Sequence, residues 1–377
     1  MKIDILGDAL LTKFEDYDNH HKVIHIQDDK TGLNGFIAVH NAQLGPALGG
    51  CRMVKYASEA DALRDVLRLS RGMTYKNALA GLPLGGGKAV IIGDPYKDKT
   101  EGMIKAMAQA VHSLQGLYIT AEDSGTGEKD MEWISSQTPY VAGIPGHGAG
   151  DLGGNPSPVT AWGVYRGMKA AALKKYGHDD LGKLTVAVQG LGAVGYTLCR
   201  LLHKDGAQIV ATDIRESVIE QARKEFAVIK IVDADGIFVS KAHIFSPCAL
   251  GAQLNDKTIP LLNVDIIAGA ANNQLAAPRN GEQLAKRNIL YTPDYVINAG
   301  GVIAIAYEYF ARAGHNPFTG KLNRDSMLAH VELIGPTVTK IFNIADARGA
   351  LAGQAADEMA ESIFREQPQT NGLQAAG

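Results

Sequence analysis

The sequence lacks the features that mark secreted, membrane and disulfide-rich proteins. It holds only three cysteines in 377 residues, Cys51, Cys199 and Cys248, and they form neither a C-x-x-C pair nor a disulfide framework. No apolar run approaches the roughly 20 residues that a membrane span needs. The opening residues MKIDILGDAL do not resemble a signal peptide. We therefore expect buried, inert thiols in a cytoplasmic protein with no membrane partner.

A surplus of basic charge is also missing. The 37 lysines and arginines nearly balance the 40 aspartates and glutamates, and the formal net charge is −3, so we expect no nucleic-acid partner. The 11 histidines are scattered, and the single H-x-x-x-H spacing, His21 and His25, leads into a predicted strand rather than lying on a helix, so we expect no metal. A hydrophobic share of 46% over this length fits two ordinary globular domains.

Glycine, in contrast, is plentiful, with 43 residues, and it divides the chain. Glycine and proline crowd residues 142–159, AGIPGHGAGDLGGNPSPV, which is typical of a hinge or a domain boundary. On both sides of this segment the apolar pattern predicts alternating strands and helices, among them a capped helix after Ser58. This alternation indicates an α/β protein. We expect the polar tail from Gln367 to be disordered.

The strongest local motif is a G-x-G-x-x-G turn made of Gly190, Leu191, Gly192, Ala193, Val194 and Gly195. It follows an apolar strand, opens a helix and precedes a second strand that ends at Asp213, which is the arrangement of a dinucleotide-binding unit. The first glycine is expected to make the turn, the second to admit the pyrophosphate and the third to bring helix and strand together. Backbone N–H groups at the helix start would face the phosphates.

Asp213 lies 23 residues after Gly190, where its carboxylate is placed to accept hydrogen bonds from the adenosine ribose hydroxyls. A carboxylate at this position would repel a 2′-phosphate, which favours NAD over NADP as the cofactor. Arg215 lies close by in the sequence and leaves the strictness of this preference open.

A second glycine-rich segment, residues 72–95, holds Lys76 and Lys88. Lys88 directly follows glycines 85–87, which raises the possibility of a phosphate-binding P-loop. A P-loop requires a glycine six positions before its lysine and a serine or threonine directly after it. Leu82 and Ala89 occupy those positions, so the P-loop hypothesis fails. Two readings remain: a sheltered acid–base lysine, or a solvated lysine after a turn.

In this context the chain resembles the Glu/Leu/Phe/Val family of amino acid dehydrogenases, most closely its leucine branch. The resemblance runs from about residue 45 to residue 302. It is carried by the segments LGPALGGCRM, RGMTYKNALAGLPLGGGKAVIIGDP, ITAEDSGT, GNPSPVTAWGVYRGMKAA, VAVQGLGAVG, SPCALGA, IIAGAANNQL and YTPDYVINAGGVI.

The resemblance implies roles for three charged residues. Lys76 would hold the substrate α-carboxylate, a task suited to a compact cation. Lys88 would act with a bound water in the carbinolamine and imine steps, because a buried lysine near another cation exchanges protons near neutral pH. Glycines 85–87 would let the substrate approach it. Asp123 would be the acid–base partner of the substrate amine. The structural alternatives are a helix-end lysine, a solvated lysine and a helix cap, respectively.

The resemblance also implies the surroundings of the reacting atoms. Backbone at Gly49 and Gly50 would contact the substrate carboxylate, and Asn272 and Asn273 would lie near the nicotinamide. The expected side-chain pocket is apolar and consists of Leu48, Ala121, Val302 and Ile305. Glutamate dehydrogenases carry a lysine where Leu48 stands, so glutamate should be excluded and a branched-chain amino acid favoured over the alternatives phenylalanine and tryptophan.

The expected architecture is a two-domain α/β protein with a cleft between the domains. A substrate and oligomerisation domain would span residues 1–150 and be completed by C-terminal helices over about 330–366. A Rossmann NAD-binding domain would span 151–329. Closure of a hinge would bring nicotinamide to substrate and exclude water. Family members are commonly homo-oligomers, so we expect an octamer or a dimer.

The expected reaction is reversible oxidative deamination of the amino acid to its 2-oxo acid and ammonium. The alternative from another class is a regulatory dinucleotide-binding protein without turnover, which would be free to lose Lys88 or Asp123. No chemistry is expected at three other sites. We expect Arg52 to form a structural ion pair, His147 to be a hinge residue, and the His20–His21 pair to lie on the solvated surface.

Overall fold

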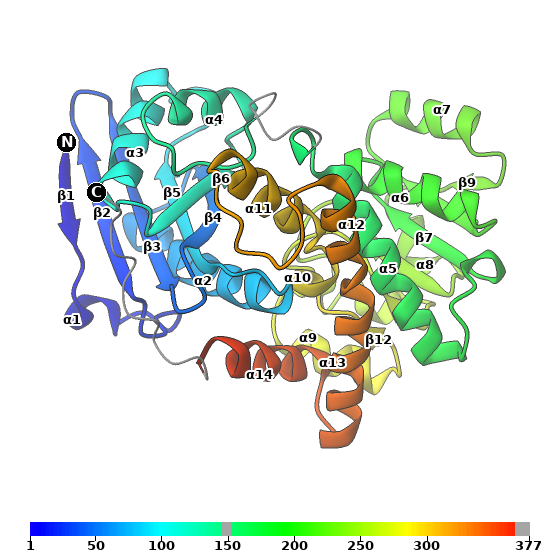
Figure 1. Cartoon of the computed structure of the whole chain (residues 1–377). Helices are drawn as coiled ribbons and strands as arrows, with labels where there is room; N and C mark the ends of the chain where they lie inside the picture. The colour runs from blue at the N-terminus through cyan, green and yellow to red at the C-terminus, as the bar shows by residue number, and fades with distance from the viewer. Residues whose placement is uncertain (145–151, 366–377) are drawn as a thin grey trace. The chain divides into compact units, whose positions relative to one another are not determined.

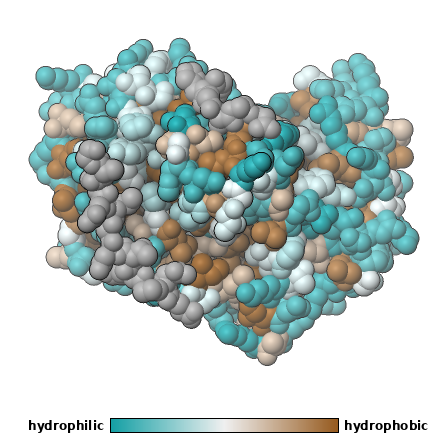
Figure 2. All heavy atoms as spheres, in the orientation of Figure 1, coloured by the Kyte–Doolittle hydropathy of each residue, from teal (hydrophilic) through white to brown (hydrophobic). Residues whose placement is uncertain are grey.

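The computed structural model describes residues 1–144 and 152–365, and its chain divides into two compact units (Figure 1). The first unit consists of Met1–Gly154, Ile305–Arg324 and the chain from Ala360, and the second of Asn155–Ala304 and Asp325–Met359. The surface in Figure 2 mixes hydrophilic and hydrophobic residues. Within the described residues, no helix is long and apolar enough to cross a membrane. His147 and the tail from Gln367 lie outside the described residues.

The first unit is built on a mixed six-stranded sheet with the order β1-β2-β3-β5-β4-β6. Strands β1, β2, β3 and β5 pair antiparallel, whereas β4 pairs parallel with both β5 and β6. Their bounds are β1 Lys2–Ile5, β2 Lys22–Asp28, β3 Leu33–Asn41, β4 Ala47–Val54, β5 Gly85–Ile92 and β6 Tyr118–Glu122. The parallel strands β5, β4 and β6 therefore lie together at one side of the sheet.

Helices cover both faces of this sheet. Helix α2 (Glu59–Leu79) packs Val66 and Leu67 against Phe36 and Val90 on one face. The predicted cap is confirmed, because the Ser58 side chain accepts a hydrogen bond from the backbone N–H of Asp61. Helix α3 (Glu101–Ser113) packs on the opposite face, in a core that includes the buried β4 and β5 residues Cys51, Met53, Ala89 and Ile91. The short helices α1 (Asp8–Leu11) and α4 (Glu128–Ser135) complete this part of the unit.

The second unit contains a six-stranded, fully parallel sheet with the order β12-β11-β10-β7-β8-β9. Its strands are β7 Thr185–Gln189, β8 Gln208–Thr212, β9 Ile229–Ile231, β10 Ile244–Pro247, β11 Ile266–Ile267 and β12 Leu290–Tyr291. The chain runs outward from β7 to β9 and then returns to β10 on the other side of β7. This is the Rossmann order, with its switch point between β7 and β10, and the predicted fold class is confirmed.

The helices of the second half begin with α5 (Ser157–Tyr176), which starts at the end of the glycine-rich segment. The others are α6 Ala193–Lys204, α7 Glu216–Glu225, α8 Gly236–Val239, α9 Arg279–Lys286, α10 Asp294–Ile297, α11 Gly300–Arg312, α12 Arg324–Glu332, α13 Ile334–Arg348 and α14 Ala352–Arg365, with two short 3₁₀ turns at Leu181–Lys183 and Ile259–Leu261. Helix α11 starts in the second unit and ends in the first.

Helices α12 and α13 group with the second unit, whereas the sequence-based division gave residues from about 330 to the first domain. Polar contacts with α5 explain the grouping, because Trp162 Nε1 donates to Glu332 at 2.7 Å and Lys174 pairs with Asp346. The domain boundaries near 150 and 329 stay predictions.

The last turn of α14 packs against the start of the chain. The ring of Phe364 lies 5.4 Å from that of Tyr75, and the Tyr75 hydroxyl donates to Glu361 at 2.6 Å. Arg365 pairs with Asp18 at 3.5 Å. The first unit thus joins α2 and the segment between α1 and β2 to the last turn of α14.

The prediction of a solvated pair at His20–His21 is wrong for His20. His20 is buried, its Nε2 lies 3.0 Å from the carbonyl oxygen of Leu67, and its ring packs edge-on against His40. Burial lowers the pKa of His20 to about 4, so the imidazole is neutral at physiological pH. His21 is exposed, as expected.

All three cysteines are free thiols. The predicted burial is confirmed for Cys51 and Cys199, whereas Cys248 is partly exposed. Burial raises the pKa of Cys51 to about 12, so this thiol stays protonated and unreactive.

Candidate active site

The candidate site of the first unit lies on the face of the sheet that α2 covers. Alternate residues of a strand point to the same face, so Leu48, Gly50 and Arg52 of β4 share one face. The parallel register pairs Leu48 with Gly86 and Cys51 with Ala89, which places Gly50 beside Lys88. On the other side of β4, Gly50 pairs with Ala121 of β6. The predicted substrate residues of three strands are thereby brought together.

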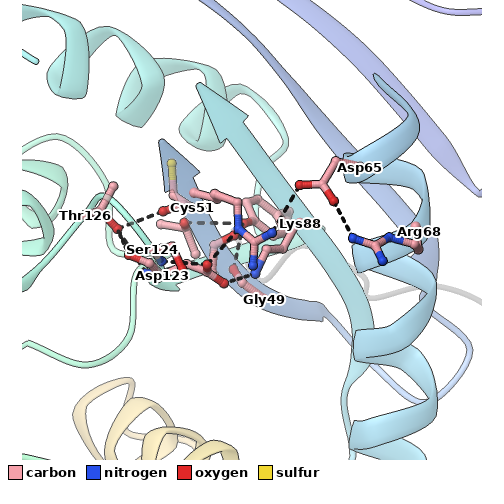
Figure 3. Close-up of polar contacts among 12 residues, drawn as sticks. Gly49, Cys51, Asp65, Arg68, Lys88, Asp123, Ser124 and Thr126 are labelled. Carbon is pink, nitrogen blue, oxygen red and sulfur yellow. Dashed lines mark hydrogen bonds and ion pairs between the residues drawn. The ribbon is translucent and has the colours of Figure 1, made fainter. Parts of the chain in front are cut away.

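Lys88 and Asp123 form a direct ion pair, in which Lys88 Nζ donates to Asp123 Oδ2 (Figure 3). The Lys88 side chain is only 5% exposed, so it is not a solvated lysine. Asp123 does not cap helix α4, because α4 starts at Glu128 with Gly127 as its N-cap. The structure thus pairs Lys88 with a carboxylate, a partner that the sequence argument about a second cation did not consider.

Asp123 is held by several groups besides Lys88. Its Oδ1 accepts hydrogen bonds from Arg52 Nε at 3.0 Å and from the backbone N–H of Ser124 at 2.6 Å. Its own N–H donates to Thr126 Oγ1, which in turn donates to the carbonyl oxygen of Cys51 (Figure 3). Although burial alone would raise the pKa of Asp123, the charges of Lys88 and Arg52 outweigh it and hold this pKa well below its usual value. Asp123 is therefore ionised at neutral pH.

Glycines 85–87 have a different role from the one expected. A Cβ at Gly85 would overlap the carbonyl oxygen of Asn41, and a Cβ at Gly86 would overlap the backbone nitrogen of Thr74 in α2. A Cβ at Gly87 would lie 2.6 Å from the ring of Tyr118. These glycines therefore let the protein pack on β5, and the expectation that they make room for substrate is not supported by their contacts.

Gly49 and Gly50 are equally confined. A Cβ at Gly49 would overlap the carbonyl oxygen of Gly87, and a Cβ at Gly50 would lie 2.8 Å from Cβ of Asp123. The carbonyl oxygen of Gly49 accepts a hydrogen bond from the buried hydroxyl of Tyr118 at 2.6 Å (Figure 3). Gly50 thus allows Asp123 to reach Lys88, while its predicted contact with substrate stays a prediction.

Lys76 lies in the last turn of α2 and is half-buried. The next residue, Asn77, is fully buried and donates its Nδ2 to the carbonyl oxygens of Gly85 at 2.6 Å and Leu48 at 3.4 Å. These bonds fix the end of α2, and with it Lys76, against β4 and β5. Sequence reasoning missed Asn77, since its only local signal is its position next to Lys76.

The two residues of the predicted side-chain pocket that lie on β4 and β6 are apolar and buried. Leu48 is 1% exposed and Ala121 is 5% exposed. Val302 and Ile305 lie one turn apart on α11 and are half-buried. Because Val302 belongs to the second unit and Ile305 to the first, the structure does not bring these two together with Leu48 in one unit, and their place in the pocket stays a prediction.

In the second unit, the glycine turn after β7 fits a dinucleotide. Gly190 has a positive φ of 95° and packs against Ala249, and a Cβ at Gly195 would overlap the carbonyl oxygen of Gly190. Gly192, the N-cap of α6, has no atom within 4 Å of a would-be Cβ. Space is therefore left only at the middle glycine, in front of a helix N-terminus, which suits a pyrophosphate. Ala193 and Val194 form the first turn of α6.

Asp213 follows β8 and anchors the same turn. Its Oδ2 accepts from the backbone N–H of Leu191 at 2.7 Å, and its Oδ1 accepts from Arg215 Nε at 3.0 Å. Arg215 Nη2 also donates to the carbonyl oxygen of Leu191 at 3.2 Å. Arg215, which the sequence left as an open question, is thus paired with Asp213. The predicted ribose contact of Asp213 stays a prediction.

Asn272 and Asn273 lie exposed in the loop after β11. The carbonyl oxygen of Asn273 accepts from the N–H of Ala252 at 2.7 Å, so this loop lies against the loop that follows β10. Asn298, which sequence reasoning did not single out, donates its Nδ2 to Asn272 Oδ1 at 2.7 Å. Because Gly190 packs against Ala249, the asparagine loop, the β10 loop and the glycine turn gather at the switch point.

These features define the class of protein. A Rossmann sheet with an open glycine turn, in a chain that also holds a buried lysine–aspartate pair, fits a dinucleotide-dependent dehydrogenase. Residues 20–140 match the family described as Glu/Leu/Phe/Val dehydrogenase, dimerisation domain. Residues 155–223 and 213–340 match Glutamate/Leucine/Phenylalanine/Valine dehydrogenase. The chain belongs to the Glu/Leu/Phe/Val dehydrogenase family.

Individual relatives cover nearly the whole chain. A leucine dehydrogenase of Geobacillus stearothermophilus is 50% identical over 353 residues, 93% of this chain and 92% of the relative. A phenylalanine dehydrogenase of Bacillus thermotolerans is 42% identical over 364 residues, 96% and 92% of the two chains. The crystal structure of L-tryptophan dehydrogenase from Nostoc punctiforme superposes with a TM-score of 0.78 at 39% identity, covering 92% of this chain and 96% of that one. The chain is an NAD-dependent amino acid dehydrogenase, which sets aside the non-catalytic alternative.

Proposed function

We propose that this dehydrogenase acts on branched-chain L-amino acids, namely leucine, valine and isoleucine, and converts them reversibly to 2-oxo acids and ammonium. The observation that carries the proposal is the buried Leu48, which lies on the same face of β4 as Gly50, two residues from the strand position next to Lys88. A substrate side-chain carboxylate at this wall would be buried without a cation, which costs several kcal/mol. The 50% identity to a leucine dehydrogenase supports the aliphatic branch over the aromatic one.

The roles of the charged residues follow from their contacts. Lys76 holds the α-carboxylate of the substrate, and the Asn77 bonds keep the end of α2 in place for this. Asp123, ionised, accepts a proton from the substrate ammonium group and so leaves a neutral amine on the reacting carbon. The α-carbon then loses its hydrogen as hydride, which NAD accepts when bound. The product of this oxidation is an imino acid.

Hydrolysis of the imino acid uses the same two side chains. Once Asp123 is protonated, Lys88 loses its carboxylate partner, gives one proton to the solvent and becomes neutral. Water adds to the imine carbon, the neutral Lys88 takes one proton from the water, and the result is a carbinolamine. Asp123 returns its proton to the nitrogen, the C–N bond breaks, and the hydroxyl proton of the carbinolamine passes to the departing ammonia, which leaves as ammonium. The direct contact between Lys88 Nζ and Asp123 Oδ2 supports this sequence, because it places the groups that exchange protons with the water and with the nitrogen side by side.

The second unit holds the cofactor. The open space at Gly192 and the N–H groups at the start of α6 bind the pyrophosphate, and Asp213 binds the adenosine ribose. Asn272 and Asn273, at the switch point, contact the nicotinamide side of the dinucleotide. A 2′-phosphate would meet the Asp213 carboxylate, which supports NAD as the preferred cofactor.

The test is a comparison of kcat/KM with NAD across leucine, valine, isoleucine, phenylalanine, tryptophan and glutamate, followed by the absorbance of NADH. We expect the three branched-chain amino acids to lead and to differ among themselves by no more than roughly 10–200-fold, since each methylene changes selectivity by about that much. A preference for glutamate would contradict the role of Leu48. A preference for an aromatic amino acid would contradict only the choice of branch.

We also propose a cytoplasmic homo-oligomer, either a dimer or an octamer. The name of the first matching family, a dimerisation domain, supports self-association. The free, mostly buried cysteines fit a reducing compartment. Light scattering on the purified protein gives the subunit number, and a monomer at working concentration would refute the assembly.

A further inference from the structure

Arg52 contacts the proposed catalytic carboxylate Asp123 but takes part in none of the reaction steps given above. It lies on β4, on the same face as Gly50 and Leu48, and its side chain is 20% exposed. Its guanidinium joins two carboxylates: Nε donates to Asp123 Oδ1 at 3.0 Å, and Nη1 donates to Asp65 Oδ2 at 3.1 Å. The ion pair predicted for Arg52 therefore exists, but one of its partners is the proposed catalytic carboxylate.

Asp65 holds Arg52 from the side away from the reaction. It lies on α2 with its side chain 14% exposed, and it also accepts from the Tyr56 hydroxyl at 2.7 Å and from Arg68 Nη2 at 2.9 Å (Figure 3). Asp65, itself held by Tyr56 and Arg68, thus fixes one edge of the Arg52 guanidinium. An arrangement of this kind is more than charge balance, because it dictates the direction in which Arg52 Nε points.

The two oxygens of Asp123 have different partners as a result. Oδ1 is taken by Arg52 and the N–H of Ser124, whereas Oδ2 contacts Lys88. We propose that Arg52 is a positioning residue that holds Oδ1 fixed, so that every proton exchanged with the substrate nitrogen and with Lys88 passes through Oδ2. This inference rests on the proposed roles of Lys88 and Asp123.

An arginine suits this task for a chemical reason. During turnover both Lys88 and Asp123 change protonation state, so the attraction between their opposite charges is present in only part of the reaction cycle. A guanidinium keeps its charge throughout the working pH range and presents two donor edges in a fixed plane. Arg52 therefore holds the carboxylate in one orientation while Lys88 is neutral. A lysine at position 52 would keep the charge but could not bridge Asp65 and Asp123 with the same geometry.

The pH dependence of turnover reports on this arrangement. The charged and titratable groups around Asp123 come from three strands and, behind Arg52, from α2 and the segment before it: Arg52 and Cys51 of β4, Lys88 of β5, Tyr118 and Glu122 of β6, then Asp65, Arg68 and Tyr56. Asp123 accepts a proton only when ionised, so activity falls as pH drops through its pKa. Loss of Arg52 removes a charge that lowers this pKa. In wild type this acid limb lies below the usual carboxylate range, and in the absence of Arg52 it should move to higher pH.

The experiment compares wild type with Arg52→Gln, Arg52→Lys and the control Arg64→Gln, each assayed for leucine oxidation with NAD over a range of pH. Arg64 is an exposed arginine of α2 whose partner is Asp61, away from Asp123. For Arg52→Gln we expect kcat to fall roughly 10- to 100-fold, as misplacement of a reacting group does, with a smaller change in KM and the shifted acid limb. Arg52→Lys should show the wild-type acid limb of the pH profile but only part of the wild-type kcat. Arg64→Gln should match wild type in both.

Each outcome is decisive. A folded Arg52→Gln variant with the wild-type acid limb would overturn the inference, even if kcat falls, because a purely structural role lowers kcat at every pH. If Arg52→Gln does not fold, the Arg52→Lys variant provides the test. A wild-type kcat in Arg52→Lys would overturn the inference, whereas a reduced kcat with the acid limb of the pH profile unchanged would support it. Absence of turnover by wild type with every amino acid would instead refute the proposed function, which is a separate result.

Discussion

The middle glycine of the turn after β7 offers a sharp test of the cofactor site. At Gly192 the backbone has φ −67° and ψ −174°, an extended conformation that alanine adopts readily, and nothing lies within 4 Å of a would-be Cβ. Gly192→Ala should therefore leave the fold intact, and the loss of chain entropy in the unfolded state should stabilise it by up to about 1 kcal/mol. Its methyl group would, however, occupy the space left for the pyrophosphate.

The size of the effect follows from overpacking. Forcing one extra methyl group into a fitted contact costs about 1–3 kcal/mol, which corresponds to a roughly 5- to 150-fold weaker affinity for NAD. The matched control is Gly195→Ala, where the new Cβ would overlap the carbonyl oxygen of Gly190 within the protein itself. The same 1–3 kcal/mol would then be lost from folding, so the melting temperature should fall by roughly 2–12 °C.

Calorimetric titration with NAD and thermal melting without cofactor separate the two variants. Gly192→Ala should melt at or slightly above the wild-type temperature and bind NAD poorly, whereas Gly195→Ala should melt at a lower temperature than wild type. Binding of NAD to Gly192→Ala with wild-type affinity would refute the assignment of the pyrophosphate to this turn. Neither measurement depends on which amino acid is oxidised, so this test is independent of the proposed substrate.

Three further perturbations have clear expected outcomes. Lys88→Ala should lower kcat by roughly 10²- to 10⁴-fold, while NAD affinity persists because the predicted NAD-binding residues belong to the second unit. Asp213→Ser should raise the use of NADP relative to NAD, because it removes a repelling carboxylate and releases Arg215. His20 has a pKa of about 4 when folded, so unfolded chains bind its proton first and stability should drop by about 2 kcal/mol between about pH 7 and about pH 5. His20→Asn should remove most of that drop.

A different experimental result would contradict each of these three predictions. Near-normal turnover of a folded Lys88→Ala variant would exclude a catalytic role for the lysine. Equal catalytic efficiency of wild type with NAD and NADP would contradict the role of Asp213. For His20, urea unfolding gives the free energy of unfolding at the two pH values. If this free energy drops by the same amount in wild type and in His20→Asn, the imidazole does not stay neutral in the fold.

Local patterns in the sequence predicted the parts of the fold that depend on local chemistry. The strand, G-x-G-x-x-G turn and helix around Gly190 form one continuous segment, so their assignment needed no tertiary information. Local pattern left Lys88 either sheltered or solvated, and only the family resemblance implied a buried lysine. Its pairing with Asp123 joins residues 35 apart in the chain and emerged only from the structure. Gly86 shows where local sequence stops being informative. A glycine near a lysine suggests room for a ligand, but in the structure the backbone of α2 fills that space.

The same limit applies to residues whose role depends on a distant partner. His20 stands among polar residues and looks solvated in sequence, yet α2 covers it with Leu67 and Ser70, far along the chain. Arg52 could be assigned an ion pair from its charge and neighbourhood. Nothing in the linear order of residues indicated that this pair would end on Asp123.

The docking of α14 on α2 has a consequence for biosynthesis. Tyr75 and Glu361 are 286 residues apart in the chain, and Phe364 covers the same ring close to the end of the described residues. At a translation rate of about 5–20 residues per second, the ribosome needs roughly 14–60 seconds to bring the second partner after the first. Throughout that interval the nascent first unit lacks its closing helix. A message cut short before codon 361 would yield chains in which the Tyr75 hydroxyl lacks its Glu361 acceptor and the Tyr75 ring lacks Phe364.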